Sequence, residues 1–139
     1  MPAEIVEKEL SFKILKAAFE VHNELGPGFL ESIYEEAMKI ELKTQDLTVE
    51  RQKRIAVKYK EQIIGEHVLD TVVNGKIILE YKAVTELLAV HEQQALSYLK
   101  ATGLPLAIVI NFGTPRVQYR RIVNTAGKTS HSSFARKQS

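Results

Sequence analysis

The sequence has 139 residues, of which 45% are hydrophobic and 26% are charged, as is typical of one folded domain rather than a fibrous or globally disordered chain. No apolar run approaches the roughly 20 residues of a membrane helix, and the first ten residues lack the order of a signal peptide. These features predict a cytoplasmic protein. The absence of cysteine excludes disulfides, thiol catalysis and thiolate zinc sites, but leaves oxygen-ligated cations open.

Charge is unevenly distributed along the chain, although the net charge is only +2. Six basic and no acidic residues follow position 115, which leaves 13 basic and 17 acidic residues in 1–115. A mildly acidic body does not suit a broad basic surface for duplex DNA. We expect a single domain over residues 1–124 and a flexible basic tail over 125–139, because that tail is rich in small polar residues.

Two amphipathic helices are predicted first. Helical spacing over residues 5–25 predicts one stripe, formed by Ile14, Ala18, Val21 and Leu25, with Leu15, Phe19 and His22 beside it. We interpret His22 as a core histidine. The Gly-Pro-Gly at 26–28 ends this helix, and a second helix is expected from near Phe29, with a stripe at Leu30, Ile33, Ala37 and Ile40.

The rest of the sequence predicts five strands and one more helix. Alternating residues predict strands over 47–60, 62–73 and 76–84, and the helical period returns over 86–103. A buried strand over 105–112 and an edge strand over 117–123 complete the order α-α-β-β-β-α-β-β. This predicts an α/β (α+β) domain in which helices flank a mixed central sheet.

Charged side chains interrupt the otherwise apolar strand at 76–84. Glu80 and Lys82 share one face of that strand, where a charge needs a partner, a metal or a function. Together with Asp70 and Glu31, they provide the carboxylate oxygens and the ammonium group that could surround one Mg²⁺, with Mn²⁺ as a substitute. We therefore predict Asp70, Glu80 and Glu31 as metal ligands.

The hairpin register tests this prediction. A two-residue Asn74-Gly75 turn would place Asp70 and Glu80 on opposite faces of the sheet. A three-residue loop over 73–75 would put Asp70 opposite Ile78 and on the same face as Glu80. We predict this register or another that preserves the shared face.

These residues resemble a known family. The segments ELGPGFLESIYEEAM, VERQ, VLD, ILEYKAV, QALSYLKATG and INFG are similar to the GxxExxY protein family, whose pattern is matched by Gly28, Glu31 and Tyr34. That family is placed in the PD-(D/E)XK nuclease-like superfamily, which implies a restriction-endonuclease-like fold. Its active-site pattern is matched by Asp70 and Glu80-Tyr81-Lys82, with Leu69 where a proline sometimes stands. Gln94 and Tyr98 match the glutamine-tyrosine pair of RecB-type nucleases.

The resemblance and the chemistry together predict a Mg²⁺-dependent nuclease that acts on nucleic acid, with DNA favoured over RNA. Asp70, Glu80 and Glu31 would hold the cation and Lys82 would assist the attacking water, while Tyr34, Gln94 and Tyr98 would orient groups or contact substrate. Glu31 could instead stabilise a helix N-terminus, and Tyr34 could be a core aromatic residue. The alternative function is a non-catalytic member of the fold that binds nucleic acid or protein. A homodimer paired through 117–123 is also possible.

Overall fold

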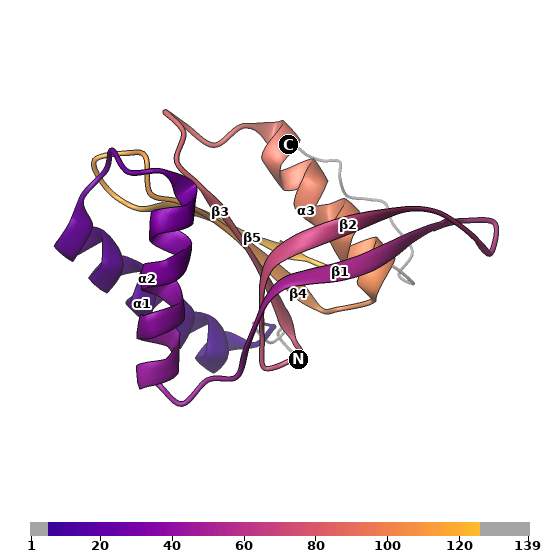
Figure 1. Ribbon diagram of the computed structural model, residues 1–139, viewed down its shortest axis with the longest axis horizontal. Helices are drawn as coiled ribbons and strands as arrows, with labels where there is room; N and C mark the ends of the chain where they lie inside the picture. The colour runs from indigo at the N-terminus through magenta and orange to yellow at the C-terminus, as the bar shows by residue number, and fades with distance from the viewer. Residues whose placement is uncertain (1–5, 126–139) are drawn as a thin grey trace, which may run out of the picture.

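The computed structural model describes residues 6–125. Its three helices and five strands follow the predicted order (Figure 1). They are α1 (Lys8–Leu25), α2 (Glu31–Thr44), β1 (Val49–Tyr59), β2 (Gln62–Val73), β3 (Ile77–Lys82), α3 (Ala89–Thr102), β4 (Leu106–Asn111) and β5 (Gln118–Val123).

One mixed sheet has the strand order β1-β2-β3-β4-β5. Hairpin connections make β1–β2, β2–β3 and β4–β5 antiparallel, whereas β3 and β4 are parallel. The parallel pair requires a crossover, and α3 supplies it. The predicted α/β class is therefore confirmed, and β5 is an edge strand as expected.

Helices cover both faces of the sheet. Ile77 and Leu79 of β3 belong to the core cluster under α1 and α2, and Ile78 belongs to the cluster under α3. Strands buried on both faces read as continuous apolar runs, which explains the sequence of β3 and β4. Figure 1 shows the outer ends of β1 and β2 extending beyond this layered part as a two-stranded ribbon.

The apolar stripe predicted for α1 is largely confirmed. Ile14, Ala18 and Val21 are buried, whereas Phe19 is exposed. His22 is a core histidine as interpreted, because it is buried and its Nε2 lies 2.9 Å from the backbone oxygen of Thr114.

The stripe predicted for α2 is wrong. The helix begins at Glu31, close to the expected start near Phe29, but Leu30, Ile33 and Ile40 are exposed and Ala37 is only partly buried. The core instead receives the stripe one residue further along, Tyr34, Met38 and Leu42. Both stripes have helical spacing, and the large rings decided between them, since Tyr34 stacks on Phe112 with ring centroids 4.6 Å apart.

The β2–β3 loop differs from the predicted one by a single residue. Val73 pairs with Ile77 across residues 74–76, and both Asn74 and Gly75 have positive φ. The predicted pairing of Asp70 with Ile78 is therefore wrong. The shared face is nevertheless preserved, because this register brings Asp70 level with Glu80 and directly opposed residues lie on one face.

None of the helices in residues 6–125 is both long enough and apolar enough to cross a bilayer. The predicted tail lies outside the described residues except for Thr125, and so does Ile5 at the start of the first predicted helix.

Candidate active site

The candidate site lies where β2 and β3 stop pairing with each other. Thr71 and Leu79 form the last ladder pair of the two strands. Beyond it, the Asp70 N–H donates to the Glu80 carboxylate at 3.3 Å, and the Tyr81 N–H donates to the Asp70 carboxylate at 2.9 Å. Each acidic side chain thus accepts a hydrogen bond from the backbone of the opposite strand. These crossed bonds hold two carboxylates side by side at the opening between the strands.

The β1–β2 ribbon turns over at the level of Asp70 and Glu80, so that the face directed to α2 on one side of this point is directed to α3 on the other. Arg51 bonds Glu35 of α2 at 3.2 Å, whereas Lys53 lines a groove against α3. Residues two apart in a regular strand share a face, so the ribbon must turn over between them. Gln52 stands at the turnover with φ of 52°, and its amide donates to Glu35 at 3.0 Å. Asp70 lies across from Gln52, at the position where the ribbon leaves the sheet.

The two carboxylates repel each other in a poorly hydrated place. Glu80 is only 7% exposed. Burial, followed by the charge of Asp70, raises the pKa of Glu80 from 4.5 to about 8. Burial also raises the pKa of Asp70, against the opposing effect of the hydrogen bond from Tyr81. A pair of crowded acids with raised pKa values is typical of functional sites.

Lys82 adds a positive charge on the same face of β3 as Glu80. Its charge lowers the pKa of both acids, but less than burial raises it. The position of Lys82 is fixed from β4, because the Lys82 carbonyl accepts the Phe112 N–H at 2.8 Å. The buried Asn111 amide then bonds both the N–H and the carbonyl of Val84, at 2.9 and 3.0 Å. The end of β3 that carries Lys82 is therefore held by the end of β4.

Glu31 lies apart from the Asp70–Glu80 contact. It is the first residue of α2 and is exposed, and its charge raises the pKa of both Asp70 and Glu80. Within residues 6–125, no group of three or more His, Asp or Glu side chains is arranged to hold a metal ion. The structure therefore brings Asp70 and Glu80 together and leaves Glu31 outside their contact. A first-turn acid also stabilises the helix dipole.

Tyr34 is a core residue. Its hydroxyl donates to the Gly26 carbonyl at 2.6 Å and accepts the Phe29 N–H at 3.2 Å, and its ring is fully buried. These bonds close the turn between α1 and α2. The hydroxyl therefore has a structural use, as one of the two interpretations of this residue expected.

The glutamine-tyrosine pair on α3 is only partly directed to the site. The ring of Tyr98 stacks on His67 of β2 with centroids 4.0 Å apart. Burial raises the pKa of Tyr98, and the charges of Glu80 and Asp70 raise it further, so Tyr98 borders the acids. Gln94 is exposed, and its backbone carbonyl accepts the Ser97 hydroxyl at 2.6 Å.

Sequence reasoning missed two residues at this site. His67 borders it through Tyr98, and Glu35 adds negative charge that raises the pKa of Asp70. Glu35 lies one helical turn after Glu31, which was the available signal for it; the sequence carried no comparable signal for His67, which lies on a strand.

Comparisons with known proteins identify the family and the fold. A family model described as the PD-(D/E)XK nuclease superfamily matches residues 8–122. The crystal structure of a protein named SSO0001 resembles this fold with a TM-score of 0.55 and 18% sequence identity, covering 68% of this chain. The match spans 50% of that structure's chain, so this chain corresponds to about half of its length. No curated protein is similar enough to count as a match.

Proposed function

The chain belongs to the PD-(D/E)XK nuclease superfamily, and on this premise we propose that it is a Mg²⁺-dependent nuclease that prefers DNA to RNA. Within the superfamily we assign it to the GxxExxY family, on the strength of Gly28, Glu31 and Tyr34.

The Asp70–Glu80 pair is the observation that supports this proposal most strongly. The two carboxylates are held together by hydrogen bonds to backbone N–H groups, and their charges destabilise each other. Proteins hold Mg²⁺ with one or two carboxylates and leave its other positions to water and substrate oxygens. The donor set therefore fits a hard cation without a third side chain, and Glu31 is proposed as an additional ligand acting through water.

Each residue would have a separate task in phosphodiester hydrolysis. Asp70 and Glu80 would hold the cation, which when bound would neutralise phosphate charge and lower the pKa of the attacking water. Lys82 would direct its ammonium group at a phosphate oxygen and stabilise the negative charge of the transition state. The reaction forms one bond from water oxygen to phosphorus and breaks the bond to the leaving sugar oxygen, which receives the proton.

A non-catalytic binding protein of the same fold is the second candidate. Within residues 6–125, no group of three or more His, Asp or Glu side chains is arranged to hold a metal ion, and this observation favours it. On this alternative, the charged cluster would serve structure or binding alone.

Cleavage of labelled single-stranded, duplex and branched DNA, with RNA for comparison, tests the nuclease proposal in the presence of Mg²⁺ or Mn²⁺. We expect Lys82→Met to lower the rate by about 10²-fold or more, as for the loss of one transition-state donor. Lys76→Met is the matched control, because Lys76 is exposed in the loop at the far end of β3. A wild-type protein that binds these substrates but cleaves none of them would establish the binding alternative.

Calorimetric titration with Mn²⁺ tests the metal site without relying on catalysis. We expect one cation to bind the wild type and binding to be lost in Asp70→Asn. Glu86→Gln, which removes an exposed carboxylate close to the end of β3, should bind Mn²⁺ like the wild type. Equal Mn²⁺ binding by Asp70→Asn and the wild type would refute the assignment of Asp70.

The cytoplasmic location and the homodimer stay predictions. In the described part of the chain β5 is bordered only by β4, so its outer edge is the proposed place for a second copy to pair.

A further inference from the structure

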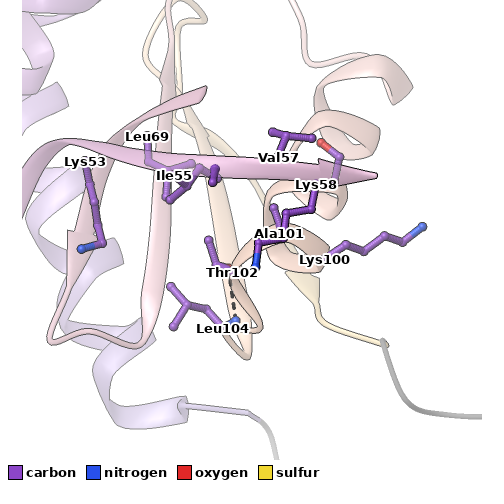
Figure 2. A pocket seen from close by; sticks show the side chains of 11 residues that line it. Lys53, Ile55, Val57, Lys58, Leu69, Lys100, Ala101, Thr102 and Leu104 are labelled. Carbon is purple, nitrogen blue, oxygen red and sulfur yellow. Dashed lines mark hydrogen bonds between the residues drawn. The ribbon is translucent and has the colours of Figure 1, made fainter. Parts of the chain in front are cut away.

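A groove separates the β1–β2 ribbon from the C-terminal half of α3, outside the candidate active site. Its volume is about 610 Å³, within the range of ligand pockets in proteins. Lys53, Ile55 and Lys58 of β1 border it on one side, Lys100 and Leu104 on the other, and Leu69 of β2 lies at its inner end (Figure 2). Leu69 directly precedes Asp70, so the groove leads away from the carboxylate pair.

The charges of the groove are all of one sign. None of the eleven described residues that line it is acidic, whereas three are lysines. Figure 2 shows the Lys53 and Lys100 amines on opposite sides of the view, with Ile55, Leu69 and Leu104 between them. Lys53 contacts Glu50 at 3.1 Å. No ion pair engages Lys58 or Lys100 within residues 6–125, so their ammonium groups are available to an anionic ligand.

The apolar part of the lining indicates an anionic ligand that also has apolar or aromatic groups. Ile55 and Leu104, which are only partly buried, offer hydrocarbon surface over the buried Leu69, and a bare phosphate or the outside of a duplex would not use it. Further along β1, the exposed ring of Tyr59 carries the Lys60 amine 5.3 Å from its centroid. Lysines that follow a backbone, together with apolar or aromatic surfaces for unpaired bases, are the features that bind single strands.

We propose that this groove binds a single strand of nucleic acid beyond the bond that is cut. Lys53, Lys58 and Lys100 contact its phosphates, and the apolar lining contacts its sugars and bases. That the strand is also a substrate rests on the proposed nuclease function, whereas binding itself does not. Tyr98, which stacks on His67 and borders the carboxylates, lies on α3 next to Ser97 of the groove lining.

A lysine at the end of α3 could also serve the stability of the helix, and the test must separate that role from phosphate binding. Lys100 lies in the last turn of α3, where a positive charge interacts favourably with the helix dipole and stabilises the helix. A dipole role changes the free energy of unfolding, whereas a phosphate contact changes the salt dependence of binding.

The experiment measures binding of a fluorescent oligothymidylate of about 12 nucleotides, by anisotropy, with EDTA present so that no cleavage occurs. Salt is varied over roughly 50 to 200 mM. Each phosphate contact to a single strand contributes about 0.7 to the slope of log K against log salt. We therefore expect the double variant Lys58→Gln/Lys100→Gln to lower the slope by about 1.4.

The matched control removes the same charge elsewhere. Lys16 of α1 and Lys76 of the β2–β3 loop are exposed and outside the groove, so Lys16→Gln/Lys76→Gln should keep the wild-type slope. An equal fall of the slope in both double variants would show a general charge effect and overturn the proposal. An unchanged slope in Lys58→Gln/Lys100→Gln would overturn it too, as would tighter binding of a duplex of the same length through these lysines.

Two further arms complete the test. An RNA strand of the same length shows whether the groove prefers single-stranded DNA or single-stranded RNA. Binding of either strand that depends on Lys58 and Lys100 supports the proposed binding site. Hydrolysis of bis(p-nitrophenyl) phosphate, which is too small to reach from the carboxylates into the groove, reports on the nuclease proposal alone. A wild-type protein that does not hydrolyse this compound but binds the oligonucleotide through Lys58 and Lys100 would contradict the proposed catalysis and support the proposed binding site.

Discussion

Replacing Glu80 by glutamine is expected to stabilise the protein above pH 8. The wild-type carboxylate must ionise in a buried place beside Asp70, and this raises its pKa from 4.5 to about 8. A raised acid pKa means that the folded state holds the proton more tightly than the unfolded state. The stability linked to Glu80 is therefore complete below about pH 4.5, falls as the pH rises, and is lost above about pH 8.

The magnitude follows from the same pKa change. Because a tenfold change in protonation equilibrium corresponds to about 1.36 kcal/mol, ionisation of Glu80 costs at most about 5 kcal/mol of unfolding free energy above pH 8. Glutamine retains an oxygen that can accept the Asp70 N–H now bonded at 3.3 Å and carries no charge. We expect the Glu80→Gln variant to exceed the wild type by several kcal/mol at about pH 9 and to match it closely at about pH 5.

Urea unfolding in EDTA at both pH values measures this difference, since groups that do not interact with Glu80 contribute equally in the two proteins. Parallel pH profiles for the wild type and the variant would refute the reasoning, because Glu80 would then have the same pKa in both states. Added Mg²⁺ should stabilise the wild type at the higher pH by preferential binding to the folded state, and should have little effect on Glu80→Gln.

Two further substitutions test structural assignments. Tyr34→Phe removes the bond to Gly26 and should cost about 1–2 kcal/mol of unfolding free energy, without changing hydrolysis of a small phosphodiester; a large loss of hydrolysis would instead assign Tyr34 to catalysis. Gly113→Ala should cost about 2 kcal/mol or more by thermal unfolding, because a β-carbon there would stand 2.5 Å from the Val84 carbonyl oxygen. Gly65→Ala, which meets nothing within 4 Å, should stay within about 0.5 kcal/mol of the wild type, and similar losses in the two glycine variants would contradict the close approach.

Much of the fold followed from local patterns. Alternation identified β2 and β3, the continuous apolar run identified β4, and the element order was correct. The face of α2 was not predictable in the same way. Adjacent residues on a helix are only about 100° apart, so the stripes through Ile33 and through Tyr34 are equally regular. Stacking of Tyr34 on Phe112, some 78 residues along the chain, selected the second.

At the site, too, local sequence predicted some features and contacts between distant segments decided the others. The charges of Glu80 and Lys82 in an apolar strand marked them from sequence alone, because isolated charges are costly there. The sequence could not choose the loop, since Asn-Gly suits several hairpin lengths. It also gave no sign of His67 beside Tyr98, which requires β2 and α3 to lie against each other.

The amino-acid sequence by itself determined which residues have the chemistry of a cation site and which segments become helices and strands, because both depend on residue type and short-range spacing. Only the tertiary structure decided that Asp70 and Glu80 hold each other across the opening between β2 and β3, and that Glu31 lies outside their contact. It also created the lysine-lined groove, whose walls come from β1 and α3. Contacts between distant segments depend on strand register and helix rotation, which single-residue shifts can change and which packing of the whole domain fixes.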